Sequence, residues 1–259
     1  MAEMSASVSH RSITLFICLV FFSTASSNLY AAAKTRKEQA KETEVWQPVP
    51  PIVKAAPGNA PSDAMVLFDG TDLQHWRGED TDQPGWRVVG NELIVVPGAG
   101  DILSKASFCD IQLHLEWRTP KQTSGLHGQK RGNSGVFFQD RYEVQILDSY
   151  NNVTYSNGQA AALYKQSIPL VNASRPPGVW QSYDIIFIAP KFNQRGELEA
   201  KARLTVFHNG VLVQHDVTVE GSTVHIGKPT YTAHGCAPLR LQDHKNPVGF
   251  RNIWVRRLD

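Results

Sequence analysis

The segment YEVQILDSY, residues 142–150, places acidic and amide side chains in a short alternating stretch. In an extended strand successive side chains point to opposite faces, so Val144 and Ile146 share one face while Glu143 and Gln145 share the other. Glu143 and Gln145 then lie about 7 Å apart on one face. A carboxyl group there can act as a general acid or base, and the amide can orient a substrate hydroxyl. An isolated glutamate is more often a solvated side chain, so this interpretation depends on companions elsewhere.

Two other alternating segments supply such companions. Glu116 and Arg118 fall on the polar face of DIQLHLEWR, and Arg240, Gln242 and His244 follow the same alternation in LRLQDH. If these strands lie side by side, their polar faces form one groove lined with carboxyl, guanidinium, amide and imidazole groups. These groups donate and accept the hydrogen bonds that sugar hydroxyls make, and two of them transfer protons readily.

Smaller candidates flank these strands. Asn133, in the loop GNSG, can present its amide to a ligand, although such a loop is more commonly a simple turn. Asp243 precedes His244, but alternation sends the two side chains to opposite faces, so an Asp–His pair does not follow from the spacing. With a further carboxylate these two residues could ligate a divalent metal, yet no ligand spacing requires one. A metal therefore stays open, and no other cofactor is indicated.

Strand signals dominate from Ala64 onward. Short apolar or alternating runs recur about every ten residues, and Gly90-Asn91 and Asn209-Gly210 separate two pairs of them as turns. Convincing helical periodicity is absent, apart from one short turn near 159–164. Many short strands with turn residues between them predict an all-β fold, an antiparallel β-sandwich or jelly roll.

The N-terminus reads as a targeting segment. His10 and Arg11 precede the apolar run ITLFICLVFF, 13–22, and small residues follow as far as AAA, 31–33. This order is typical of a secretory signal, and the apolar run is shorter than the ~20 residues that a membrane helix needs. We therefore expect a signal peptide over 1–33 and a secreted or periplasmic protein without stable membrane insertion.

Composition divides the remainder into two parts. Residues 34–63 are first charged and then proline-rich, which predicts a disordered linker, and 64–259 form one domain.

The formal net charge of +2 with dispersed basic residues gives no indication of nucleic acid as a partner. Cys109 and Cys236 remain after signal cleavage, and whether they pair is not determined by the sequence.

Several motifs, in the order in which they occur, resemble those of a known family. The segments are LFDGTDLQHWR, GWRVVGNELIV, GDILSKASFCDIQLHLEWR, GNSGVFFQDRYEVQILDS, PPGVWQSYDI, VFHNGVL and LRLQDHKNPVGFRNIWVRRL. Together, from about Met65 to Leu258, they resemble the 3-keto-disaccharide hydrolase domain, a family with a concanavalin A-like jelly roll. Lys245 departs from the family pattern, in which a glycine usually follows the histidine.

The resemblance implies an enzyme that cleaves glycosides already oxidised to a ketone at sugar carbon 3. In that chemistry the C2 proton is removed, the C1 leaving group departs and water adds. The expected proton-transfer pair is Glu143 and His244. Arg118, Arg240, Arg251 or a bound metal is expected to stabilise the charge on the ketone oxygen. The expected substrate-binding residues are Glu116, Arg118, Asn133, Gln145, Asp148, Arg240, Gln242 and Arg251. A carbohydrate is the expected partner, supplied by a sugar 3-oxidoreductase acting upstream.

Two alternatives stay open at this point. Laminarinase-like enzymes of the same architecture carry E-x-D-x-x-E, and Glu143, Gln145 and Asp148 match its spacing with Gln in place of the middle Asp. Retaining hydrolysis would need two carboxyls ~5–5.5 Å apart, whereas the odd offset puts Asp148 on the opposite face unless a bulge intervenes. The second alternative is a non-catalytic carbohydrate-binding module, because the fold alone fixes no function.

Overall fold

The computed structural model describes residues 33–259, so the predicted signal peptide lies outside the described residues except for its last position. The chain divides into two compact units, 1–51 and 52–259. In the first, the predicted linker contains a short helix, α1 (Arg36–Lys41), none of whose residues is buried. Thr35 caps this helix: its hydroxyl accepts from the Glu38 N–H, and the Glu38 carboxylate accepts from the Thr35 N–H at 2.8 Å. A capping box without a core partner accounts for so short a helix.

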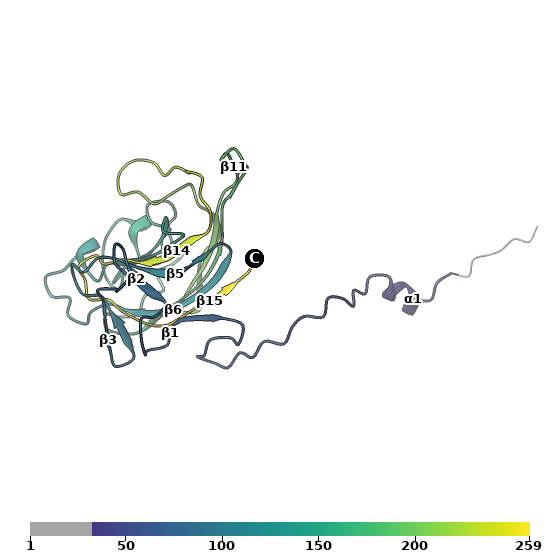
Figure 1. Cartoon of the computed structure of the whole chain (residues 1–259), viewed down its shortest axis with the longest axis horizontal. Helices are drawn as coiled ribbons and strands as arrows, with labels where there is room; N and C mark the ends of the chain where they lie inside the picture. The colour runs from purple at the N-terminus through teal and green to yellow at the C-terminus, as the bar shows by residue number, and fades with distance from the viewer. Residues whose placement is uncertain (1–32) are drawn as a thin grey trace, which may run out of the picture. The chain divides into compact units, whose positions relative to one another are not determined.

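The second unit is a sandwich of two antiparallel sheets, which Figure 1 shows as two layers, with β14 and β5 in one and β6 and β15 in the other. In spatial order the eight-stranded sheet contains β13 (Val211–Thr218), β12 (Arg203–His208), β9 (Gln181–Ile188), β6 (Ile111–Arg118), β15 (Gly249–Arg257), β4 (Glu92–Ile94) and β3 (Arg87–Val89), and β1 (Met65–Phe68) also pairs with β15. The five-stranded sheet contains β2 (Trp76–Gly78), β5 (Ile102–Phe108), β14 (Ala237–Leu241), β7 (Ser134–Phe138) and β8 (Tyr142–Ile146).

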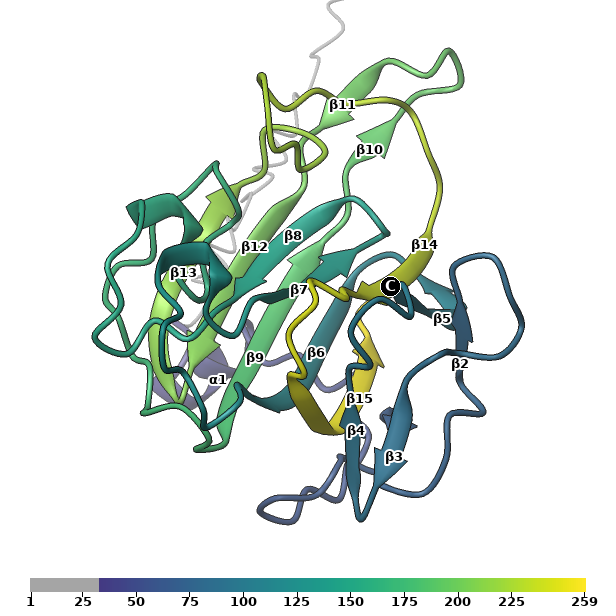
Figure 2. The same cartoon turned by 90° about the vertical axis from the view of Figure 1, so that its left-hand side faces the viewer.

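Outside the two sheets lie a hairpin and two single turns of 3-10 helix. They are β10 (Lys191–Phe192) with β11 (Leu198–Ala200), η1 (Gly128–Lys130) and η2 (Ser156–Gly158). The hairpin projects at the top of Figure 2. The predicted all-β jelly-roll sandwich is confirmed, and helices contribute little to it.

The core lies between the two sheets and is built by alternation. On β6, Ile111, Leu113, Leu115 and Trp117 are buried, and on β8 the core-facing residues include Val144. Full burial of an aliphatic side chain of this size contributes about 1.5–3 kcal/mol. The apolar faces of the two sheets are therefore fixed toward each other, and the intervening polar residues must point outward on both sides of the molecule.

Turns and one covalent link close the sandwich. The predicted hairpin at Asn209-Gly210 joins β12 to β13, with φ of 53° and 79° at the two residues, a conformation that Asn and Gly tolerate best. Cys109 and Cys236, each adjacent to a strand end, form a disulfide with a Cα–Cα distance of 4.7 Å. Within residues 33–259 no helix is long and apolar enough to cross a membrane.

Candidate active site

A pocket of about 310 Å³ opens on the outer face of the five-stranded sheet. Strand β7 pairs with both β8 and β14, so that Phe137 lies opposite Glu143 on one side and Arg240 on the other. Alternation turns these three side chains away from the core. The pocket is lined by Asn133, Phe137, Glu143, Gln145, Tyr164, Thr223, His225, Arg240, Gln242 and His244.

Six of the residues singled out in the sequence meet here, from segments about 100 positions apart in the chain. They are Asn133, Glu143, Gln145, Arg240, Gln242 and His244. Their side chains alternate out of strands or follow directly from strand ends, which is why the polar faces of β8 and β14 form one wall. Their chemical roles remain a proposal.

Glu143 is the buried acid of this pocket, with 5% of its surface exposed. Burial raises the pKa of the Glu143 carboxyl from 4.5 to about 8, the positive charge of Arg240 lowers it in part, and the negative charge of Asp101 raises it further. Its backbone N–H donates to Thr223 Oγ1 at 3.0 Å, which joins the strand to the loop above it. A carboxyl with this pKa exchanges a proton near neutral pH.

Gly135 leaves the space that the Glu143 carboxyl fills. A Cβ at Gly135 would lie 2.7 Å from Glu143 Oε1, closer than real Cβ contacts. Gln145 lies opposite Gly135 across the strand pair. With its nitrogen turned toward the acid, the Gln145 amide donates to Glu143 Oε1 at 3.0 Å and to the Ser134 carbonyl at 3.1 Å. A hydrogen bond thus joins the Gln145 amide to the Glu143 carboxyl.

Arg240 is held rigidly beside the pocket. Its Nη1 lies 2.5 Å from Asp101 Oδ2 and its Nε lies 2.5 Å from Asp140 Oδ1, while its guanidinium sits 3.6 Å from the centre of the Phe137 ring. Two carboxylates and an aromatic face fix this orientation. Arg240 is therefore a cation in a fixed position, and its charge lowers the pKa of Glu143.

Two loops supply the opposite wall. The Tyr164 hydroxyl is 2.7 Å from the Tyr155 hydroxyl and 3.3 Å from His225 Nδ1. Burial raises the pKa of Tyr164, and the hydrogen bond between its hydroxyl and that of Tyr155 and the charge of Glu143 act in the same direction. Sequence reasoning missed Tyr164, Thr223, His225 and Phe137. The first three come from irregular segments, where an aromatic or imidazole residue gives no periodic signal.

His244 lies exposed at the mouth of the pocket, and Asp243 points elsewhere. The Asp243 carboxylate accepts from the N–H groups of Gly98 at 2.6 Å, Gly100 at 3.2 Å and Lys245 at 2.8 Å. Asp243 therefore anchors a turn, and no Asp–His pair forms, as the alternation indicated. Within residues 33–259 the one trio of side chains spaced for a metal ion is Cys109, Cys236 and Asp259, whose cysteines form the disulfide.

Three sequence candidates belong to the other side of the molecule, which corrects their placement in one groove with Glu143. Glu116 and Arg251 pair at 2.6 Å on the outer face of the eight-stranded sheet, and Arg118 pairs there with Glu92 at 2.5 Å. Alternation correctly gave these residues an outward face. It could not tell which of the two sheets each strand joins, and a sandwich has two outer faces.

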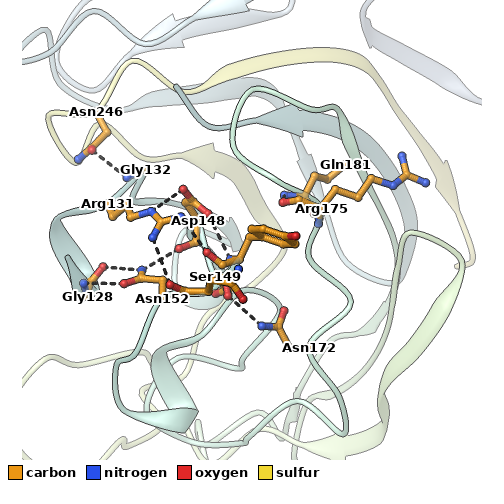
Figure 3. A network of polar contacts seen from close by, with 12 residues as sticks. Gly128, Arg131, Gly132, Asp148, Ser149, Asn152, Asn172, Arg175, Gln181 and Asn246 are labelled. Carbon is orange, nitrogen blue, oxygen red and sulfur yellow. Dashed lines mark hydrogen bonds and ion pairs between the residues drawn. The ribbon is translucent and has the colours of Figure 1, made fainter. Parts of the chain in front are cut away.

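Asp148 is also removed from the pocket. It is buried, with 1% exposed, and its Oδ2 accepts from Arg131 Nε at 2.7 Å while Oδ1 accepts from the Tyr150 N–H at 3.2 Å (Figure 3). These contacts, with Asn152 donating to the Asp148 carbonyl at 2.7 Å, fold the loop that follows β8. The carboxylate is thus a loop anchor, which corrects its expected role in substrate binding. Among the described residues that line the pocket, Glu143 is the one carboxyl, so retaining hydrolysis lacks its second acid there.

Known proteins match this chain in sequence and in fold. Residues 63–256 match the 3-keto-alpha-glucoside-1,2-lyase-like domain. A solved structure from Parabacteroides distasonis, described as a candidate glycosyl hydrolase, is 45% identical to this chain, covers 84% of it and 96% of its own length, and superposes with a TM-score of 0.82. A second structure from that organism, described in the same way, is 21% identical over 76% of this chain and 94% of its own, with a TM-score of 0.56, and shares the fold. The comparison with curated proteins gave no match.

Proposed function

The chain belongs to the 3-keto-alpha-glucoside-1,2-lyase-like domain family, a carbohydrate-acting family, and we propose that it cleaves glycosides whose sugar carries a ketone at carbon 3. The observation that supports this chemistry best is Glu143, a buried carboxyl with a pKa of about 8 that faces a polar pocket. Ordinary acetal hydrolysis requires a pair of acids, whereas removal of a proton next to a ketone requires one base tuned near neutrality.

The proposed reaction begins at the carbon beside the ketone. A base takes the C2 proton, and the C–H electron pair forms the C2=C3 double bond of an enolate whose charge lies on the ketone oxygen. That charge returns to re-form the ketone, a C1=C2 double bond forms, and the C1–O bond breaks, so that the leaving oxygen takes a proton from an acid. Addition of water across C1=C2 then completes net hydrolysis, and release before this step gives a lyase product.

We assign the proton transfers and the charge stabilisation to residues of the pocket. Glu143, deep in the pocket, is the proposed base for C2, and Arg240, held by Asp101 and Asp140, is the proposed cation beside the enolate oxygen. His244, at the solvent side, is the proposed acid for the leaving oxygen, which must exit toward the opening. Gln145 is proposed to orient a sugar hydroxyl together with the acid that it contacts.

The proposed substrate requires a second enzyme that produces it. A 3-keto-glycoside must be supplied by an oxidoreductase that acts on sugar hydroxyls, and we place that class of enzyme upstream. We also propose that the mature protein works outside the cytoplasm. The Cys109–Cys236 disulfide supports this location, since such bonds persist in oxidising compartments.

The test is turnover of a purified 3-keto-disaccharide, followed by separation of the two sugars. Glu143→Gln and His244→Ala should each lower kcat/KM by at least about a hundredfold, the usual size of a general acid–base contribution. Matched controls are Glu199→Gln and His215→Ala, which change exposed residues of β11 and β13 and should keep full activity. Parallel assays with a chelator test the metal that the sequence left open.

Three results would redirect the proposal. Full activity in both pocket variants would place the chemistry elsewhere. Absence of turnover with undiminished sugar binding would favour a carbohydrate-binding module. Cleavage of an unoxidised glucan would favour ordinary hydrolysis.

A further inference from the structure

Three lysines lie next to residues that line the Glu143 pocket, and we name Lys130, Lys165 and Lys245 the lysine rim. On one edge, Lys165 Nζ donates to the His225 carbonyl at 2.6 Å and lies 3.4 Å from His225 Nδ1. On the other edge, Lys130 and Lys245 line a second hollow of about 420 Å³. His244 lines both this hollow and the Glu143 pocket, so the two spaces meet at that imidazole.

The charges of the lysine rim lack carboxylate partners. Within residues 33–259 the lysines in ion pairs are Lys34 and Lys201, so no rim ammonium has a carboxylate within 4.0 Å. One acidic group lines the second hollow, Asp243, and its oxygens accept backbone N–H groups. Glu143 is mostly neutral at pH 7, because burial raises its pKa to about 8. A ligand anion would meet little opposing charge.

Two lysines of the rim have a backbone conformation that glycine adopts more readily than other residues. Lys165 has φ of 58° and Lys245 has φ of 61°, in the left-handed region. A residue with a Cβ costs about 1 kcal/mol there relative to glycine. Lys165 is held in place: its N–H donates to the Asn157 carbonyl at 2.8 Å, and its ammonium lies 5.6 Å from the centre of the Tyr155 ring and 5.8 Å from that of Tyr164. Because the chain has lysine at both positions in spite of this cost, we infer that the positive charge has a function there.

We propose that the lysine rim binds a negatively charged group, a carboxylate or a sulfate ester, on the sugar unit next to the one held over Glu143. The preferred substrate is then an acidic glycoside. That the sugar over Glu143 carries the ketone rests on the proposed function, but the charge preference itself concerns binding. Attraction between partly exposed charges weakens as salt shortens the Debye length, which gives the preference a signature that shape complementarity lacks.

The experiment measures binding without turnover. Dissociation constants of the full mature chain are determined by calorimetry for maltose, for its analogue with a C6 carboxylate on the second sugar, and for its C6 sulfate ester on the same sugar. At 20 mM NaCl the two acidic probes should bind roughly five- to twentyfold more tightly than maltose, and at 500 mM NaCl the ratio should fall below about two. The difference between carboxylate and sulfate identifies which anion fits.

Variants assign the effect to the rim. Lys165→Met and Lys245→Met keep an unbranched side chain, remove the charge, and should each reduce the preference at least about threefold while maltose affinity stays unchanged. Lys191→Met, on the β10–β11 hairpin, is the matched control and should leave it intact. Equal affinity for all three probes, no binding of any, or a preference unaffected by salt would overturn the inference. Ketone-dependent turnover without a charge preference defeats this inference alone, and a charge preference without turnover defeats the proposed catalysis alone.

Discussion

A single buried acid governs what the pocket can do. Glu143 is 5% exposed, and Arg240, whose charge lowers the Glu143 pKa, is shared with Asp101 and Asp140. Because Arg240 is already paired, its charge offsets only part of the desolvation cost that Glu143 bears when it ionises. The protein therefore keeps a proton acceptor that ionises near pH 8 and is shielded from bulk water.

This pKa predicts the pH dependence of catalysis. If Glu143 must be ionised to take the C2 proton, kcat/KM should rise about tenfold per pH unit below pH 7 and level off above about 8, since the profile of kcat/KM reports the free enzyme. The measurement is the initial rate on a 3-keto-disaccharide from pH 5.5 to 9.5, with the uncatalysed elimination subtracted. A flat profile, or one that falls between pH 6 and 8, would exclude Glu143 as the base.

The same shift makes a prediction about stability. Between pH 4.5 and about 8 the folded chain keeps a proton on Glu143 that the unfolded chain has released, so the free energy of unfolding falls as pH rises through this window. The full effect is up to about 5 kcal/mol at 1.36 kcal/mol per unit of pKa. Glu143→Gln should therefore match the wild type near pH 5 and exceed it by several kcal/mol at pH 9.

Urea unfolding of both proteins at pH 5, 7 and 9 checks this, because all other groups contribute equally to the two curves. A constant difference between them across pH would show that the acid is not protonated in the folded state.

Sequence reasoning finds pocket residues that continue the alternation of a strand more readily than residues that distant loops bring in. Alternation assigned Glu143 and Gln145 a common face, and that face does border the pocket. Tyr164 and His225 reach the same pocket through loop paths fixed by contacts such as the hydrogen bond from the Glu143 N–H to Thr223, which no local pattern encodes. Asp148 shares a motif with Glu143, yet its partner Arg131 lies 17 positions away.

The strand pair β7–β8 positions the acid through its neighbour Gly135. Gly135→Ala should push the Glu143 carboxyl out of place, because the new methyl group would lie 2.7 Å from Oε1 and 3.1 Å from Cγ. We expect kcat/KM to fall at least about tenfold, since displacement of a reacting group by about 1 Å is costly. Circular dichroism should remain native, because the obstructing atoms, which also include Phe137 Cε2 at 3.0 Å, belong to side chains and not to the backbone.

One control variant makes this test specific. Gly210→Ala, where nothing lies within 4 Å of the new Cβ, should leave activity unchanged and cost only stability through its φ of 79°. An active Gly135→Ala with an unchanged pH profile would mean that the carboxyl position is not critical.

At the level of strands, alternation predicts which residues face outward but not which sheet each strand joins. Glu116 and Arg251 have the same alternation as Glu143 and Arg240, and the residue types are similar. The difference arises from pairing: β6 and β15 belong to the eight-stranded sheet, whereas β7, β8 and β14 belong to the smaller one. Which strands pair depends on long-range packing. The sequence pattern therefore does not distinguish the polar outer face of one sheet from that of the other.

The larger unit, residues 52–259, is a sandwich whose five-stranded sheet pairs strands from distant parts of the chain. The disulfide crosslinks two neighbouring strands of this sheet, because Cys109 follows β5, Cys236 precedes β14, and the two cysteines are 127 positions apart. Linking residues so far apart removes conformational entropy from the unfolded chain, typically 2–4 kcal/mol and up to about 5 for so long a loop.

Replacing both cysteines with serine should therefore lower the midpoint of thermal unfolding by roughly 5–15 °C for a domain of this size. The folded geometry of the pocket depends on strand pairing, which the change leaves intact, so kcat/KM at 25 °C should stay within about twofold of the wild type. Calorimetric scans with and without reductant check the effect: reductant should destabilise the wild type and leave the double variant unchanged. Loss of activity at 25 °C in a folded double variant would instead mean that the disulfide holds β14, and with it Arg240, in the catalytic position.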